Sequence, residues 1–119
     1  LKRILKMSRN DFLELIKEFG LELLSDNSNT AYYGLYPICS WHSYGSSILD
    51  AGTWNARSIT IYNFYPKKIN SYTQKYEGRY NGHYAIEIEE GRTLIGEKLQ
   101  EIKKQLIEEK LECVEKDFV

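Results

Sequence analysis

The chain has 119 residues, of which 42% are hydrophobic and 28% are charged, and its formal net charge at pH 7 is −1. This length fits one domain with its own hydrophobic core, and the composition excludes an intrinsically disordered chain. No apolar run approaches the ~18 residues that a membrane-spanning helix requires. We therefore expect residues 1–119 to form a single domain, with residues 1–7 as a flexible N-terminal extension.

The first ten residues are basic but lack the hydrophobic segment of a secretory signal. The two cysteines, Cys39 and Cys113, are far apart in the sequence and do not have the spacing of a metal site. Both features favour a cytoplasmic protein with reduced thiols.

A helix is predicted from Ser8 to Gly20. Ser8 and Asp11 have the spacing of a capping box, in which side chains bond the free amides of a helix N-terminus. Gly20 is placed to end the helix, because glycine adopts the left-handed conformation at low cost. Between them, apolar residues at helical spacing predict one buried stripe: Phe12, Leu15, Ile16 and Phe19.

Two short strands are expected to follow, Leu21–Ser25 and Thr30–Tyr36, joined by a turn over residues 26–29. Within the second strand Gly34 indicates a bulge, and Pro37 is expected to end it.

The segment from Ile38 to Ala56 is predicted to be a long loop, with one helical turn at Ser47–Ala51. It contains four ring-bearing residues that could recognise a partner: Trp41, His42, Tyr44 and Trp54. Long loops in compact domains are often functional. The alternative is that the two tryptophans fix this loop to the core.

Arg57–Tyr65 is apolar on both faces, which predicts a strand at the centre of the sheet. Ile59 and Ile61 share one face, and Tyr62 shares the other with Phe64. The sequence Pro66-Lys67-Lys68 is expected to break the strand.

Four tyrosines then recur at intervals of four residues: Tyr72, Tyr76, Tyr80 and Tyr84. We expect a hairpin or a bulged strand here, with its turn within Glu77–Gly82, because glycine and asparagine accept positive φ. From His83 to Glu89 the alternation predicts a strand whose apolar face carries Tyr84, Ile86 and Ile88. The tyrosines form either an exposed contact surface or the edge of the core.

The last element is predicted to be a long helix, separated from that strand by Gly91-Arg92-Thr93 and capped by Thr93. One apolar stripe contains Ile95, Leu99, Ile102 and Leu106, and a second, shifted by one position, contains Ile107, Leu111, Val114 and Phe118. A helix of ~25 residues is ~37 Å long, which exceeds the width of a small sheet. We therefore expect its far end to form a homodimer contact.

This order of elements predicts the α+β class, an antiparallel sheet of about 4–5 strands with an N-terminal helix and a long C-terminal helix packed on one face.

The middle of the chain is mildly basic. Residues 31–86 contain five basic residues, Arg57, Lys67, Lys68, Lys75 and Arg79, and two acidic ones, for a net charge of +3. This charge is small for a nucleic-acid interface. Together with the aromatic residues it defines the predicted binding surface: Trp41, His42, Tyr44, Trp54, Arg57, Lys67, Lys68, Lys75, Tyr76, Arg79, Tyr80 and His83.

No phosphate-binding glycine loop, HExxH, CxxC or GxSxG motif is present in the sequence. A nucleophile, base and orienting group could be drawn from Cys39, a histidine and Asp50, but their spacing matches no catalytic motif. The same residues with both histidines lack the spacing of a zinc site. We therefore assign no catalytic residue, no metal and no cofactor.

The interpretation we favour is a non-enzymatic binding protein that recognises a protein partner through its Tyr/Trp-rich surface, such as an inhibitor or accessory protein of phage or mobile-element type. Tyrosine, tryptophan and arginine are the residues enriched in such contacts. The alternative is a nucleotide or nucleic-acid binder, in which rings stack on bases and basic side chains contact phosphates. A second alternative is a small hydrolase that uses Cys39 or the pair His42 and His83. No membrane partner is expected.

Overall fold

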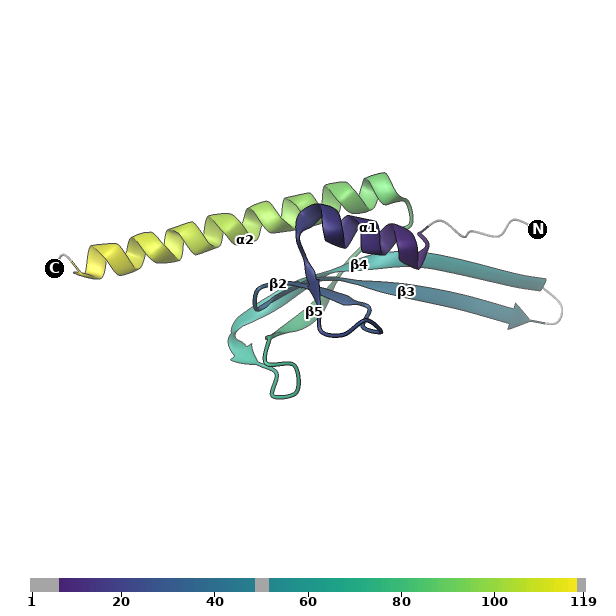
Figure 1. Cartoon of the computed structure of the whole chain (residues 1–119), viewed down its shortest axis with the longest axis horizontal. Coiled ribbons are helices and arrows are strands. Elements are labelled where there is room, and N and C mark those ends of the chain that lie inside the picture. Colours follow the sequence, from purple (N-terminus) through teal and green to yellow (C-terminus); the bar gives the residue numbers. More distant parts are fainter. Residues whose placement is uncertain (1–6, 49–51, 118–119) are drawn as a thin grey trace.

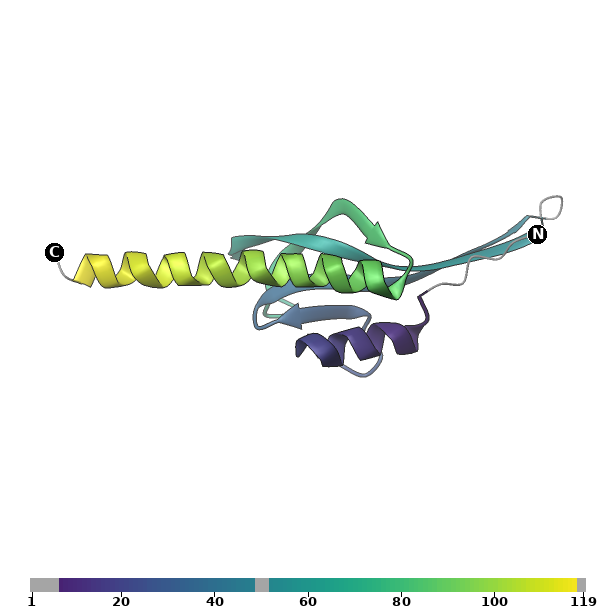
Figure 2. The same cartoon turned by 90° about the horizontal axis from the view of Figure 1, so that it is seen from above.

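The computed structural model describes residues 7–48 and 52–117, and for residues 44–48, 52–56, 81 and 112–117 it describes the backbone alone. The elements follow the order α1 (Arg9–Phe19), β1 (Glu22–Leu23), β2 (Thr30–Tyr33), β3 (Tyr36–Ile48), β4 (Gly52–Ile69), β5 (Tyr76–Ala85) and α2 (Ile88–Asp117). The strands form one antiparallel sheet in sequence order, and both helices lie over one of its faces (Figures 1 and 2). The predicted α+β fold is confirmed.

Helix α1 begins and ends as its sequence predicts. The Ser8 hydroxyl accepts a hydrogen bond from the Asp11 amide at 3.1 Å, and the Asp11 carboxylate accepts one from the Ser8 amide at 3.1 Å. Gly20 closes the helix in the left-handed conformation, with φ of 66°. Phe12, Leu15 and Ile16 form the buried stripe of this helix.

The core lies between the two helices and the covered face of the sheet, and Met7 belongs to it. Met7 is fully buried, although we expected it to end a flexible extension. Its amide donates to the Arg57 carbonyl oxygen at 3.4 Å, and its carbonyl accepts from Trp41 Nε1 at 2.8 Å. One backbone bond to β4 and one side-chain bond from β3 therefore hold the residue before α1 against the sheet.

Helix α2 begins at Ile88, so the prediction that Thr93 caps it was wrong. The Gly91 amide already donates to the Glu87 carbonyl oxygen at 3.0 Å, and the Thr93 hydroxyl donates to the Glu89 carbonyl at 3.1 Å within the helix. Acidic side chains in the first turn, including Glu89, favour the positive end of the helix dipole.

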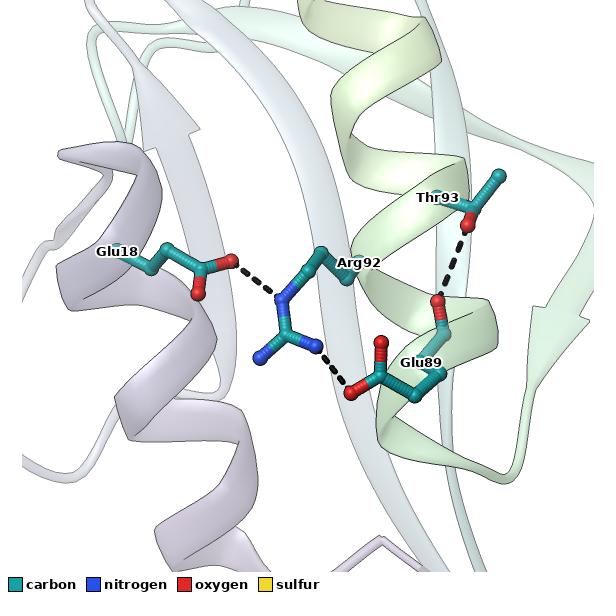
Figure 3. Close-up of polar contacts among 4 residues, drawn as sticks. All are labelled: Glu18, Glu89, Arg92 and Thr93. Atoms are coloured by element: carbon teal, nitrogen blue, oxygen red, sulfur yellow. Dashed lines mark hydrogen bonds and ion pairs between the residues drawn. The ribbon is translucent and has the colours of Figure 1, made fainter.

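Arg92 joins the two helices. Its Nε donates to the Glu18 carboxylate of α1 at 2.7 Å, and its Nη1 pairs with Glu89 one turn earlier in α2 (Figure 3). The three side chains are partly exposed, so we expect this network to orient the helices more than to stabilise them.

The predicted core stripe of α2 is confirmed in its first half. Ile95, Leu99 and Ile102 are buried, whereas Ile107 and Leu111 are 59% and 57% exposed. The helix extends beyond the sheet at the end opposite the β3–β4 hairpin (Figure 1). The side chains of Val114 and Phe118 lie outside the described part, and the predicted homodimer stays a prediction.

The strand predicted as Thr30–Tyr36 is in fact two strands. Gly34, with φ of 59°, forms a turn with Leu35, so β2 ends at Tyr33 and β3 begins at Tyr36. Pro37 lies inside β3 and does not end a strand. The register between β2 and β3 shifts beside it, at Ala31 and Tyr32, which agrees with the preference of proline for irregular pairing.

The predicted loop over Ile38–Ala56 was also wrong. These residues belong to a long hairpin in which β3 and β4 pair from Cys39↔Ile61 outward to Ile48↔Gly52. Its serine, threonine and glycine residues resemble loop residues in composition, yet backbone pairing satisfies their amides and carbonyls as in any strand. Of the predicted helical turn, Ser47 lies in β3, and residues 49–51 lie outside the described part.

Strand β4 lies inside the sheet between β3 and the edge strand β5, whereas the middle strand is β3. It continues past Pro66 to Ile69, so the break predicted at Pro66-Lys67-Lys68 was wrong. The register shift between Tyr65 and Ile69 accommodates the proline as an irregularity in the strand. The turn that follows spans Asn70–Lys75, not Glu77–Gly82. The Asn70 side chain accepts bonds from two backbone amides of this turn, those of Tyr72 (2.9 Å) and Thr73 (3.1 Å).

The two faces of β5 are reversed relative to the prediction. Ala85 is fully buried, and Tyr84 is 54% exposed. Ala85 pairs with Ile59 on the helix-covered face and belongs to the buried core there. The strand ends there, and Ile88 already belongs to α2.

The sheet curls so that the turn between β2 and β3 meets the end of the turn between β4 and β5. The Tyr76 amide donates to the Leu35 carbonyl oxygen at 2.9 Å, and Lys75 Nζ donates to the Gly34 carbonyl at 2.9 Å. A Cβ atom at Gly78 would lie 3.1 Å from Pro37 Cγ. The curl therefore closes one end of the sheet surface and leaves the other end accessible.

Candidate functional site

The sheet has a second face, turned away from the helices, that carries hydroxyl groups and rings. Ile59 and Ile61 of β4 face the helices, so by strand alternation Ser58, Thr60 and Tyr62 face the other way. Cross-strand pairing places further residues beside them on the same face: Thr30, Ser40, His42, Tyr80 and Tyr84. We call this surface the open face.

The open face contains a cavity of about 580 Å³. It is lined by His42 of β3, by Ser58, Thr60 and Tyr62 of β4, by Tyr80 and Tyr84 of β5, and by Ile86. This volume lies within the range of small-molecule sites, roughly 300–1,000 Å³. Rings and an isoleucine beside a few hydroxyl groups are also the usual lining of such sites.

The floor of the cavity is small, polar and buried. Ser58 and Thr60 are 6% and 7% exposed. Thr60 Oγ1 lies 3.0 Å from His42 Nε2 and donates to the Ser40 carbonyl oxygen at 3.5 Å. The two side chains are hydrogen-bonded to each other, and the tautomer of the imidazole decides which of them donates.

The cavity is uncharged at neutral pH. Burial lowers the pKa of His42, which keeps the imidazole neutral. Its lining, taken over the part of the chain that the structure describes, has no carboxylate, lysine or arginine. A charged ligand would lose its hydration here without gaining an opposite charge, which costs free energy. An uncharged ligand does not incur this cost.

The walls of the cavity are tyrosine rings. Tyr80 and Tyr84 are 55% and 54% exposed, so about half of each side chain is accessible to a ligand. Tyr62 is less exposed and is the cross-strand neighbour of Tyr80. Three tyrosine rings on adjacent strands supply a large apolar contact area, and their hydroxyl groups can form hydrogen bonds.

Of the twelve predicted binding residues, His42 and Tyr80 line the cavity. Trp41, next to His42, belongs to the opposite face, where its ring packs against the core and bonds Met7. The alternative that tryptophan holds this segment to the core is therefore the correct one for Trp41. The side chains of Tyr44 and Trp54 lie outside the described part.

The predicted basic residues do not gather at the cavity. Lys68 pairs with Glu77 at 3.4 Å, and Arg79 Nη1 donates to the Tyr65 hydroxyl at 3.2 Å. Lys75 lies over the Tyr32 ring, 5.7 Å from its centroid, where the curled sheet closes. Lys67 is exposed near the end of β4, and Arg57 shares the parity of Ile59, on the face away from the cavity.

Tyr76 and His83 occupy other surroundings. Tyr76 packs with Tyr36 and Phe64, at centroid distances of 5.1 and 6.1 Å, in a cluster at the closed end of the sheet. His83 lies on the helix side of β5, where a cleft of about 310 Å³ also contains Glu97 and Lys98. The two histidines thus lie on opposite faces of the sheet, and neither the open-face cavity nor this cleft has both among its described lining residues, so they are not placed as an acid–base pair.

Cys39 is unsuited to catalysis. It is fully buried on the helix-covered face, and burial raises the pKa of its thiol to about 12. Thiolate is the reactive form, so almost none is present at neutral pH. The Cys39 hydrolase that we considered has no support in this geometry.

We predict that iodoacetamide at pH 8 leaves Cys39 unmodified in folded protein and alkylates it in urea. The test uses Cys113→Ser, so that mass spectrometry counts one thiol. The raised pKa also predicts that the thiol's contribution to stability is intact below the unfolded-state pKa, about 8.5, and is lost as the pH rises toward 12. Rapid alkylation of the folded variant would contradict this placement.

The sequence interpretation missed most of the cavity: Ser58, Thr60, Tyr62, Tyr84 and Ile86. The alternation of Arg57–Tyr65 carried a usable signal, because Ser58 and Thr60 share the parity of Tyr62 opposite the two isoleucines. Serine and threonine on a central strand indicate that one face of the sheet is polar.

A fold supports many functions, so the function of this protein must be argued from the site itself. No protein family, no curated protein and no solved structure matches the chain at a significant level.

Proposed function

We propose that this is a non-enzymatic binding protein that takes an uncharged, ring-sized group of its ligand or protein partner into the open-face cavity. The observation that carries this proposal is the cavity of about 580 Å³ with tyrosine walls and a neutral hydroxyl and imidazole floor. Its lining residues on β3, β4 and β5 belong to the open face, and Figure 1 shows both helices over the other face of the sheet. No described helix is both long and apolar enough to cross a membrane.

Binding is better supported than catalysis. The two hydroxyl groups of the floor, those of Ser58 and Thr60, belong to residues that are only 6% and 7% exposed, so neither is presented as a nucleophile. The basic residues lie outside the cavity, so phosphate contacts add nothing to a ligand bound there, and the nucleotide alternative in its phosphate-dependent form is not favoured.

Amide chemical shifts of the ¹⁵N-labelled full chain test this function with simple probes. Phenol and cyclohexanol, both neutral rings, are expected to shift the amides of His42, Thr60 and Tyr84 in a saturable way. Benzoate and inorganic phosphate are expected to shift these amides at least several-fold less, because the cavity offers no opposite charge. If neither neutral ring shifts the cavity amides, or if phosphate shifts them most, the proposal is wrong.

A further inference from the structure

The outer part of the β3–β4 hairpin extends beyond the strands on either side of it. β2 pairs with β3 only as far as Ser40, and β5 pairs with β4 only as far as Ile59. From there the two strands continue as a ribbon to the pair Ile48↔Gly52, and Figures 1 and 2 show this ribbon running out beyond the rest of the sheet. A two-stranded hairpin is marginally stable in water, whereas three or more strands stabilise one another. The ribbon would therefore gain stability from a further strand.

Two contacts at the base of the ribbon show which backbone groups face outward. The Trp41 amide donates to the Asn29 carbonyl oxygen at 2.8 Å, on the side of β3 away from β4. The Arg57 carbonyl oxygen accepts from the Met7 amide at 3.4 Å, outside the β3–β4 ladder, and Arg57 is the cross-strand partner of Ser43. Outward and inward residues alternate along an antiparallel ladder, so the odd-numbered residues of both strands point their N–H and C=O groups outward.

The outward groups of β3 form a row along one edge of the ribbon. By this alternation Ser43, Gly45 and Ser47 each present one N–H and one C=O there. Within the part of the chain that the structure describes, no backbone hydrogen bond reaches these groups. On the opposite edge Met7 already bonds the Arg57 carbonyl, which leaves a shorter row on β4. The β3 edge is therefore the longer template for an added strand.

The β3 edge lacks the features that keep strands from pairing with other chains. Residues 43–48 contain no charged residue and no proline. The outer strands of the sheet do have such features. β1 is only Glu22–Leu23, and β5 contains Glu77, Arg79 and a bulge at Gly82, where φ is 85° and the register against β4 shifts. Short edge strands, charges and bulges all oppose edge-to-edge association, so the β3 edge is the one left open to it.

The row on β3 is complementary to a second copy of itself. When two copies lie antiparallel about a twofold axis at Gly45, Ser43 of one copy stands opposite Ser47 of the other, and Gly45 stands opposite Gly45. Each of these pairs exchanges two bonds, so about six backbone hydrogen bonds form. Two copies of one chain most commonly associate through such a twofold axis, which uses the same surface of both.

We propose that the chain forms a homodimer through the β3 edge of the ribbon, residues 43–47, which joins two ribbons into a four-stranded antiparallel sheet. A second copy is the occupant because the row is self-complementary and has no charge that would select a different strand. Figure 1 places this contact at the end of the molecule opposite the far end of α2, where the sequence predicts a dimer contact. The dimer does not depend on what the open-face cavity binds.

Sedimentation velocity of the full chain tests the dimer. We expect a species of twice the chain mass of 14.0 kDa. Gly45→Pro removes the central outward N–H and should weaken the dimer by about tenfold or more, while the β3–β4 ladder, which does not use this N–H, stays intact. Thr53→Pro is the matched control, because it makes the same change at an outward position of the β4 edge, and it should leave the dimer unchanged. Circular dichroism checks that each variant is folded.

Leu111→Lys tests the alternative contact. Leu111 is an exposed apolar residue of α2, and its replacement should also leave the dimer unchanged. If wild type is a monomer at every concentration, the proposal is wrong. It is also wrong if Leu111→Lys dissociates the dimer and Gly45→Pro does not, since the contact then lies on α2. Dissociation by Thr53→Pro alone would place the contact on the β4 edge instead.

Amide hydrogen exchange of wild type tests the same edge without a substitution and decides the matter if Gly45→Pro does not fold. The outward amides of Ser43, Gly45 and Ser47 should exchange at least about tenfold more slowly in the concentrated dimer than in the dilute monomer. The amides of Tyr44 and Ser46, which point toward β4, should be equally protected in both. Outward amides that stay fast in a dimer, or that are already slow in a monomer, would overturn the proposal.

Discussion

Replacing Phe12 with alanine is expected to lower the free energy of unfolding by about 3–5 kcal/mol. Phe12 is fully buried, with 0% accessible surface, and it is the largest of the fully buried side chains in the described part of the chain. Removing the ring forfeits its transfer free energy and leaves a void that helix α1 and the sheet fill only in part. Since small domains are stable by about 5–15 kcal/mol in total, the variant should be close to unfolding.

Urea denaturation followed by circular dichroism measures this effect. Phe19→Ala is the matched control, because it removes the same ring from the same helix at a partly buried position. We expect it to cost less than half as much as Phe12→Ala, since burial sets the size of the loss. An equal or larger loss for Phe19→Ala would show that the core is centred elsewhere.

Gly91→Leu is expected to destabilise the fold by about 3 kcal/mol, through overpacking. Gly91 is buried in the second turn of α2, at the closest approach of this helix to the core. A Cβ atom there would lie 3.0 Å from Ile59 Cδ1, 3.1 Å from Met7 Cε and 3.3 Å from Leu15 Cδ1. A leucine must therefore displace side chains from β4, the N-terminal segment and α1 together.

Two alanine variants of the same helix serve as controls for Gly91→Leu. Gly96→Ala should stabilise the protein by about 1 kcal/mol, because alanine is the better helix former and its Cβ would meet Phe19 at an ordinary 3.8 Å. Gly91→Ala should leave the stability nearly unchanged. The gain in helix propensity is offset because the new Cβ crowds the side-chain ends of Ile59, Met7 and Leu15. Thermal unfolding ranks the three variants, and a Gly91→Leu as stable as wild type would refute the close helix–sheet contact.

Local signals in the sequence were sufficient for the helices and for the order of the layers. The capping box at Ser8, the left-handed Gly20 and the apolar stripe of α1 depend on residues within four positions of one another, and all are confirmed. The stripe through Ile95, Leu99 and Ile102 is equally local. Such patterns depend only on residues that are close in sequence, so they can be recognised without knowledge of the tertiary contacts.

Strand pairing could not be read in the same way. The outer part of the β3–β4 hairpin, from Trp41 toward its tip, has few β-branched residues. Its composition resembles that of a loop. Its strands exist because each satisfies the backbone of the other over ten residue pairs, a property of the pair and not of either segment. The start of α2 was misplaced for a related reason, since the alternation from His83 to Glu89 matched a strand and concealed the first helical turn.

The sequence by itself determined the fold class, the presence of both helices, the caps of α1, and the buried apolar stripes of α1 and of the first half of α2, because each follows from local periodicity. Only the tertiary structure decided which residues share the candidate site. One bulge in β5 puts Tyr80 and Tyr84 beside Tyr62 and Thr60, and the pairing of β3 with β4 brings His42 to the same floor. Register depends on the balance of long-range pairing and packing, and shifting it by one residue turns every side chain of a strand to the other face.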